Sequence, residues 1–259
     1  MPRALLAVID HPALIFAASA LLLMASAWAG AGVVTRWRGL GERTSEYFAI
    51  ILAANLTLLG LVIGFTFSMA ASRYDQRKNF EEEEANAIGT EYLRADLLPA
   101  ADTARVREML KAYLAERILF YTVRDEARLT EVDARTARLQ AGMWAALLGP
   151  ARAAPTPITA LVVSGMNDVL NAQGYSQAAW SNRIPPGAWA LMLAIAISGN
   201  VLIGYGARGA GRERRLFVIL PVVVAISFSL IADIDSPRKG LILVHPANLM
   251  SLADSLRAR

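Results

Sequence analysis

The sequence has no cysteine among its 259 residues and only two histidines, His11 and His245. Disulfides, thiol catalysis and Cys-ligated metals are therefore excluded, while the redox compartment stays undetermined. It also lacks the G-x-S-x-G and H-E-x-x-H motifs and a phosphate-binding glycine loop. We therefore expect no catalytic residue, cofactor or metal, and we interpret the chain as something other than an enzyme.

Charge is nearly absent from four stretches, although 19% of all residues are charged. The stretches are 12–35, 47–71, 185–207 and 216–232. About 20 apolar residues in a helix cross a hydrocarbon core of ~30 Å, and the stretches lack the alternation of a barrel strand. We predict an all-α membrane protein with four transmembrane helices.

The first stretch has an alternative interpretation as a signal peptide. Arg3 precedes the apolar run, and Ala25-Ser26-Ala27 resembles a cleavage site. The run nevertheless continues to Val34 without a polar break, which favours a retained helix.

The second stretch leads into the longest uninterrupted pattern of the chain. No charge occurs from Tyr47 to Ala71, and the polar sequence that follows has no proline before Pro99. The pattern predicts one long helix that spans the membrane and continues into water.

Residues 72–184 show helical spacing throughout, with an amphipathic helix over 102–121 and a break at Gly149-Pro150. Thr156 is typical of a helix cap, with Pro157 in the first turn. We expect this block to form a helical extramembrane bundle within a single domain, 1–259.

One stripe of the second stretch could line a pore. It consists of Thr57, Leu61 and Phe65, and Ser68 or Ser72 continues it. In a single chain such a stripe faces lipid or a packing partner, whereas in a ring of chains it forms stacked collars. Gly60 and Gly64 on the neighbouring face would allow close helix approach.

The densest charge run is Glu81, Glu82, Glu83 and Glu84. Four consecutive residues cannot all face one way on a helix, so a solvated face is one interpretation. In a ring of chains, one or two of them would repeat at the pore mouth and enrich cations.

Asp233 and Asp235 come at the end of the fourth stretch, where acidic groups oppose the helix macrodipole. We predict that one of them pairs with Arg73 or Arg238. A metal-binding pair in a membrane enzyme is an alternative, which would require further ligands.

Several segments resemble the bacterial bestrophin-like family of unassigned function. They are Ser72-Arg73-Tyr74-Asp75, Glu84-Ala85-Asn86-Ala87-Ile88-Gly89-Thr90, Tyr92-Leu93-Arg94-Ala95-Asp96-Leu97-Leu98-Pro99 and Asp233-Ile234-Asp235-Ser236-Pro237-Arg238. Gly64-Phe65, with Arg73-Tyr74 eight residues after the phenylalanine, is similar to the second transmembrane helix of bestrophin ion channels. The resemblance implies a pentamer with four spans per chain and neck collars at Thr57, Leu61 and Phe65.

Two departures from the channel pattern matter. Thr57 stands where the family has an apolar neck residue, which implies a wetter upper collar. After Ser236-Pro237 the chain continues with Arg238-Lys239-Gly240. Asp233 and Asp235 are then the acidic ligands left, whereas calcium takes about six to eight oxygens, so we do not expect a calcium clasp.

We therefore expect a homo-oligomeric, pentameric ion channel of the bacterial inner (plasma) membrane. Its partners are copies of itself, inorganic ions and lipid, and a net charge of +4 does not indicate nucleic acid. The basic residues at the two membrane edges balance, which leaves the orientation open. The alternative is a non-conducting membrane sensor or scaffold whose helical block binds a partner.

Overall fold

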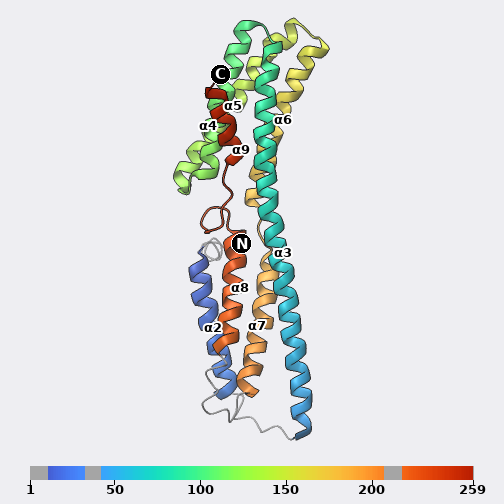
Figure 1. Cartoon of the computed structure of the whole chain (residues 1–259), viewed down its shortest axis with the longest axis vertical. Helices are drawn as coiled ribbons and strands as arrows, with labels where there is room; N and C mark the ends of the chain where they lie inside the picture. Colours follow the sequence, from blue (N-terminus) through green and yellow to red (C-terminus); the bar gives the residue numbers. More distant parts are fainter. Residues whose placement is uncertain (1–10, 33–41, 207–217, 259) are drawn as a thin grey trace. The chain divides into compact units, whose positions relative to one another are not determined.

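The computed structural model describes residues 11–32, 42–206 and 218–258, and every regular element among these residues is helical. The elements are α2 (Pro12–Gly32), α3 (Glu42–Arg94), the short 3-10 helix η2 (Ala95–Leu97), α4 (Ala100–Thr122), α5 (Glu126–Ala153), α6 (Pro157–Ser181), α7 (Pro186–Gly206), α8 (Ile219–Asp235) and α9 (Ala247–Arg257) (Figure 1). The all-α prediction is confirmed for the described part of the chain.

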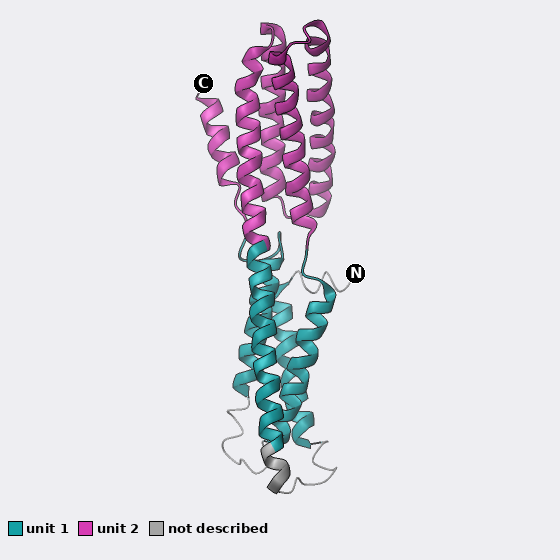
Figure 2. Cartoon of the chain, turned by 90° about the vertical axis from the view of Figure 1, so that its right-hand side faces the viewer, with its two compact units in different colours: residues 1–72, 183–243 teal, residues 73–182, 244–259 magenta. Residues whose placement is uncertain are grey.

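The chain divides into two compact units, coloured separately in Figure 2. Unit 1 comprises Met1–Ser72 and Arg183–Leu243, and unit 2 comprises Arg73–Asn182 and Val244–Arg259. The first segment of unit 2 nearly coincides with the predicted block 72–184. The C-terminal segment also joins this unit, which the sequence pattern did not indicate. A single domain over 1–259 stays a prediction.

The long helix predicted from the second apolar stretch is present as α3, a helix of 53 residues. Its sequence contains no proline, so no backbone donor is missing along its length. The chain leaves it through η2, and Pro99 stands at the N-cap of α4. The first proline after the charge-free stretch therefore marks the start of α4, while α3 itself ends earlier, at Arg94.

Three segments are long and apolar enough to cross a membrane: Pro12–Gly32, Tyr47–Leu97 and Pro157–Gly206. They contain the described parts of the first three predicted stretches. The fourth stretch corresponds to α8, which has 17 residues and is not among them. The start predicted for it, at 216, lies outside the described residues, and so do most of the short links 35–46 and 207–215. Four transmembrane helices are thus not confirmed.

Glycines allow α2 and α7 to approach each other closely within unit 1. A β-carbon at Gly204 would overlap the carbonyl group of Ala27, and one at Gly30 would overlap that of Val201. Membrane helices gain little from burying apolar surface against each other, because lipid is equally apolar, so small residues that permit backbone contact drive their packing. Contact between α2 and α7 therefore requires glycine, which has no side chain, at both positions.

Unit 2 is a bundle in which α4 packs against α5 and α9, and α5 packs against α6. The predicted cap is confirmed, since the Thr156 side chain accepts from the backbone N–H of Thr159. The predicted break at Gly149-Pro150 is wrong, because α5 continues to Ala153. Pro150 lies in the last turn of α5, where a proline removes one helical hydrogen bond without interrupting a longer run.

Replacing Gly204 with leucine should separate α2 from α7, because the side chain would have to displace the Ala27 backbone rather than a flexible group. We expect a lower thermal unfolding midpoint for the detergent-solubilised protein. Gly187→Ala in the same helix is the control, since a β-carbon there would have no described atom within 4 Å apart from the adjacent backbone of α7. Equal midpoints for the two variants would contradict the close-packing argument.

Candidate functional site

The four residues predicted to line a pore, hereafter the α3 stripe, are all exposed within the described chain. They are Thr57, Leu61, Phe65 and Ser68. The exposed fraction is 52% for Leu61 and 66% for Phe65, whereas Leu59 and Thr66 on the other side of the helix are buried. The stripe therefore faces away from the rest of unit 1.

The apolar part of α3 is covered by its own chain less than the other candidate spans. In the most apolar window of each span, 6% of the Tyr47–Leu97 residues are buried, compared with 22% for Pro12–Gly32 and 33% for Pro157–Gly206. Apart from the adjacent backbone of α3 itself, no described atom lies within 4 Å of a β-carbon at Gly60 or Gly64 either. The close approach predicted at these glycines is thus not used among the described residues, and this surface is available to lipid or to another chain.

The run of four glutamates is divided between the surface and the interior of unit 2. Glu82 and Glu83 are exposed, while Glu81 and Glu84 are buried. A helix turns by about 100° per residue, so positions three apart lie on one side. That these residues form a pore mouth stays a prediction, but two of the four carboxylates already have partners inside the bundle.

Glu81 holds the C-terminal helix α9. Its Oε1 accepts from the backbone N–H of Leu249 at 2.9 Å, and its Oε2 accepts from the Asn248 side chain at 2.7 Å. Both residues belong to the first turn of α9, where backbone N–H groups lack helical partners and the helix dipole favours negative charge. Glu81 therefore caps α9 from α3.

Glu84 forms a salt bridge with Arg117 of α4, and the side chains of both residues are 0% exposed. The Tyr121 hydroxyl lies 2.7 Å from Ser176 Oγ on α6 and donates to Glu84 Oε2 at 3.3 Å. The Arg117 guanidinium also lies 4.3 Å from the centre of the Phe120 ring. This buried polar network joins α3, α4 and α6.

The charges of this network act on each other through a medium of low polarity. Burial by itself lowers the pKa of Arg117, but the Glu84 carboxylate outweighs it, and the pKa is raised overall. Burial raises the pKa of Tyr121, and Glu84 raises it further. Arg117 thus stays charged and Tyr121 stays a hydroxyl donor across the physiological range.

Sequence reasoning missed Arg117, although a signal was present. The residue lies within the apolar face of α4 that includes Leu110, Tyr113 and Leu114, all of which are buried. A charged residue on a core-facing stripe requires an opposite charge nearby. The preceding helix contributes that charge through Glu84, which belongs to the run that the sequence analysis assigned to a solvated face or a pore mouth.

Asp233 organises the turn after α8. Its two oxygens accept from the backbone N–H of Leu241 at 2.6 Å and of Ile242 at 2.9 Å. Gly240 is required beside it, because a β-carbon there would lie 2.5 Å from the Asp233 carbonyl oxygen. Among the described residues, no group of three or more His, Cys, Asp or Glu is placed to hold a metal ion.

Asp235 is nearly fully buried and accepts from the backbone N–H of Ile184 at 3.1 Å and from Arg183 Nε at 3.2 Å. It therefore ties the end of α8 to the segment before α7 within unit 1. Arg183 supplies a cation that offsets the unfavourable charge at the helix C-terminus. Pairing of either aspartate with Arg73 or Arg238 stays a prediction.

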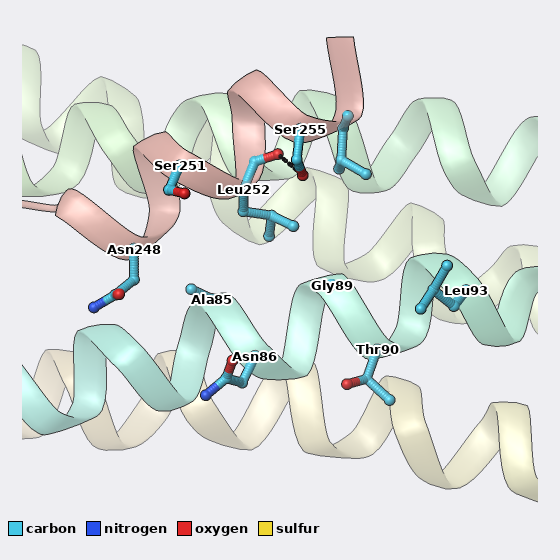
Figure 3. A pocket seen from close by; sticks show the side chains of 10 residues that line it. Ala85, Asn86, Gly89, Thr90, Leu93, Asn248, Ser251, Leu252 and Ser255 are labelled. Atoms are coloured by element: carbon cyan, nitrogen blue, oxygen red, sulfur yellow. Dashed lines mark hydrogen bonds between the residues drawn. The ribbon is translucent and has the colours of Figure 1, made fainter. Parts of the chain in front are cut away.

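Unit 2 also contains a cavity of about 390 Å³ between α3 and α9 (Figure 3). All ten residues that line it are neutral. The polar ones are Asn86, Thr90, Asn248, Ser251 and Ser255. Ligand pockets commonly enclose about 300–1,000 Å³, so the cavity has the size for a small molecule.

Glu84→Ala should destabilise unit 2 by about 3–5 kcal/mol, because it leaves the Arg117 charge buried without a partner. Glu83→Ala is the matched control from the same run, and an exposed position should change stability by about 0.5 kcal/mol or less. Thermal unfolding followed by circular dichroism compares them.

The double variant Glu84→Leu/Arg117→Met tests the cause, since removing both charges should recover much of the loss. If the double variant were as unstable as Glu84→Ala, side-chain packing rather than an uncompensated charge would explain the effect.

Most of the chain is similar to a known protein family and to solved structures. Residues 17–249 match the model of the Bestrophin-like domain. A bacterial bestrophin homologue from Klebsiella pneumoniae is similar in structure, with 17% sequence identity, a TM-score of 0.63, and coverage of 94% of this chain and 96% of that chain. A crystal structure described as that of a membrane protein is also similar. It has 16% sequence identity and a TM-score of 0.60, with coverage of 95% of this chain and 96% of that chain. No curated protein matches the sequence.

Proposed function

The chain belongs to the bestrophin-like family, and from that premise we propose that it forms a pentameric ion channel whose pore is lined by α3. The partners in this proposal are copies of the chain itself, and inorganic ions move along the α3 stripe. The class of function is therefore that of a membrane channel rather than of an enzyme.

The observation that carries the proposal is the composition of the uncovered α3 stripe. Thr57 and Ser68 bear hydroxyl groups, Leu61 and Phe65 are large and apolar, and all four are exposed. Hydroxyl groups gain hydrogen bonds where water reaches them, and narrow apolar rings control whether a pore is wetted. A ring of chains around α3 would place both kinds of side chain on one water path.

The register of the stripe gives the order of the collars. Residues four apart lie about 6 Å apart along a helix axis. The collars of Thr57, Leu61 and Phe65 therefore follow one another at intervals of about 6 Å. Leu61 and Phe65 form the dry constriction, while Thr57 keeps its collar wetter. Phe65 presents the electropositive edge of its ring to the path if the ring turns edge-on.

We further propose α8 as a fourth membrane span. Its 17 residues extend for about 26 Å, slightly less than the hydrocarbon core, and tilt or local thinning accommodates such a mismatch. The location that fits the family is the bacterial inner membrane. Pairing of the α8 end with Arg73 or Arg238, if it occurs alongside the Arg183 contact, would add a link at the membrane edge.

The burial of Glu81 and Glu84 narrows the proposed charge ring to Glu82 and Glu83. These two carboxylates are exposed and project from the polar part of α3. Repeated in each copy of the chain, they would make the local potential negative and enrich cations.

The alternative, a non-conducting sensor or scaffold, draws on a different observation. The neutral cavity between α3 and α9 has the size and the hydrogen-bonding groups of a small-molecule site. A protein of that kind would bind a ligand in unit 2 and carry no current.

Leu61→Ala/Phe65→Ala should widen the constriction and raise single-channel conductance several-fold in planar bilayers, because two apolar collars lose most of their side chains. Leu21→Ala, an exposed position on α2, is the control and should conduct like the parent. Leak-level currents from the parent and the double variant across voltages and salts, or a monomer in detergent by native mass spectrometry, would rule out the channel.

Glu82→Gln/Glu83→Gln should reduce the cation preference, because the variant removes two negative charges per chain from the proposed mouth. The reversal potential in a salt gradient measures this preference. Glu131→Gln on α5 removes an exposed charge elsewhere and should leave the potential unchanged. A preference that is the same in all three proteins would exclude the carboxylate ring.

A further inference from the structure

One buried acidic side chain in the described part of unit 2 has no hydrogen-bond partner. Glu91 of α3 is 0% exposed, and both of its side-chain oxygens lack a hydrogen-bond partner among the described residues. An ionised carboxylate in such a place would lose its hydration without compensation, which costs far more free energy than a neutral carboxylic acid does. Glu91 lies twenty residues beyond the end of the charge-free stretch at Ala71, in the polar part of α3.

A glycine on the neighbouring helix makes the space for this side chain. Gly165 of α6 is buried, and a β-carbon there would overlap both Glu91 Oε2 and Arg94 Nη1. The carboxyl group of Glu91 and the guanidinium group of Arg94 therefore border the same notch in α6.

Arg94 also forms an ion pair with α6, at a site where the Asp168 side chain is 62% exposed. Its Nη1 lies 3.7 Å from Asp168 Oδ2, and Asp168 follows Gly165 by three residues, so both lie on one side of α6. Two acidic side chains therefore lie close to Arg94: Glu91 on its own helix and Asp168 on α6. On α4, Arg107 is engaged elsewhere, since it binds Asp96 at 2.6 Å.

We propose that Glu91 is a proton-binding site whose occupancy controls the packing of α6 against α3. With the proton bound, Glu91 is neutral and Arg94 pairs with Asp168. When the proton leaves to solvent, the new carboxylate competes for Arg94 and weakens the ion pair that joins the helices.

The environment of Glu91 supports binding of a proton near neutral pH. Burial raises the pKa of Glu91, Arg94 lowers this pKa and Asp168 raises it. The resulting pKa of Glu91 is about 8. The site is therefore protonated at neutral pH and releases its proton in mildly alkaline solution.

Infrared spectroscopy of the full protein in a maltoside detergent detects the proton directly, because a protonated carboxyl has a carbonyl band that a carboxylate lacks. We expect a band at pH 7 that disappears with a midpoint near pH 8 in the parent. Glu91→Gln should abolish it, while Glu131→Gln, which changes an exposed carboxylate, should retain it. The same band and midpoint in the parent and Glu91→Gln would overturn the proposal.

Variants around the notch should move the midpoint in opposite directions, which a merely structural defect would not do. Arg94→Gln should raise it by removing the cation that favours the carboxylate. Asp168→Asn should lower it by removing the carboxylate that raises the pKa of Glu91. These two variants keep the test decisive if Glu91→Gln folds poorly, and shifts in the same direction would contradict the site.

Hydrogen exchange tests the link to helix packing. After correction for intrinsic rates, α6 amides around Gly165 should lose protection between pH 6.5 and 9 in the parent but not in Glu91→Gln. Peptides from α5 serve as the internal reference. Unchanged protection of α6 in the parent would refute the coupling.

Stability should follow the same proton. The pKa of Glu91 rises from 4.5 to about 8 on folding, so its contribution is complete below pH 4.5 and is lost as pH rises through 8. In that window the folding constant should fall by up to about tenfold per pH unit. Glu91→Gln should flatten the decline in unfolding midpoint. None of these readouts depends on ion conduction, so the site and the channel proposal can fail separately.

Discussion

The cost of burying acidic side chains on one face of α3 constrains the packing of unit 2. Glu81, Glu84 and Glu91 are spaced by three and seven residues, which keeps them on one side of the helix. Each would be costly to bury alone. The first meets the N-terminus of α9, the second meets Arg117, and the third, on our proposal, keeps a proton. The bundle is thus assembled around acids whose compensation differs in kind.

The sequence was most informative where a local rule decides the structure. The charge-free stretch with no proline before Pro99 predicted α3, and Thr156 with Pro157 predicted the start of α6. Local rules did not reveal which glutamates turn inward, because a run of four covers every side of a helix. That choice depends on Arg117, which is 33 residues from Glu84 in the sequence. The partner of Asp235 was likewise a distant residue, Arg183.

Unit 1 shows two ways of using a membrane helix. At α2 and α7, glycines such as Gly204 bring the two backbones into contact. The apolar part of α3 has glycines as well, yet open space surrounds Gly60 and Gly64. Close approach was predicted at Gly60 and Gly64, but the structure shows it at Gly30 and Gly204, which the sequence analysis did not single out. The difference arises because packing needs a complementary helix, which a periodic pattern on one segment does not specify.

The capping of α9 by Glu81 has a consequence for biosynthesis. The two residues that bind this carboxylate, Asn248 and Leu249, follow it by 167 and 168 residues. Chains emerge from the ribosome N-terminus first, so Glu84 meets Arg117 early whereas Glu81 waits until α9 has been synthesised. The bundle therefore stays incomplete while α7 and α8 are being made. A nascent chain stalled before α9 would display a charged, unsatisfied flank of α3 to chaperones and proteases.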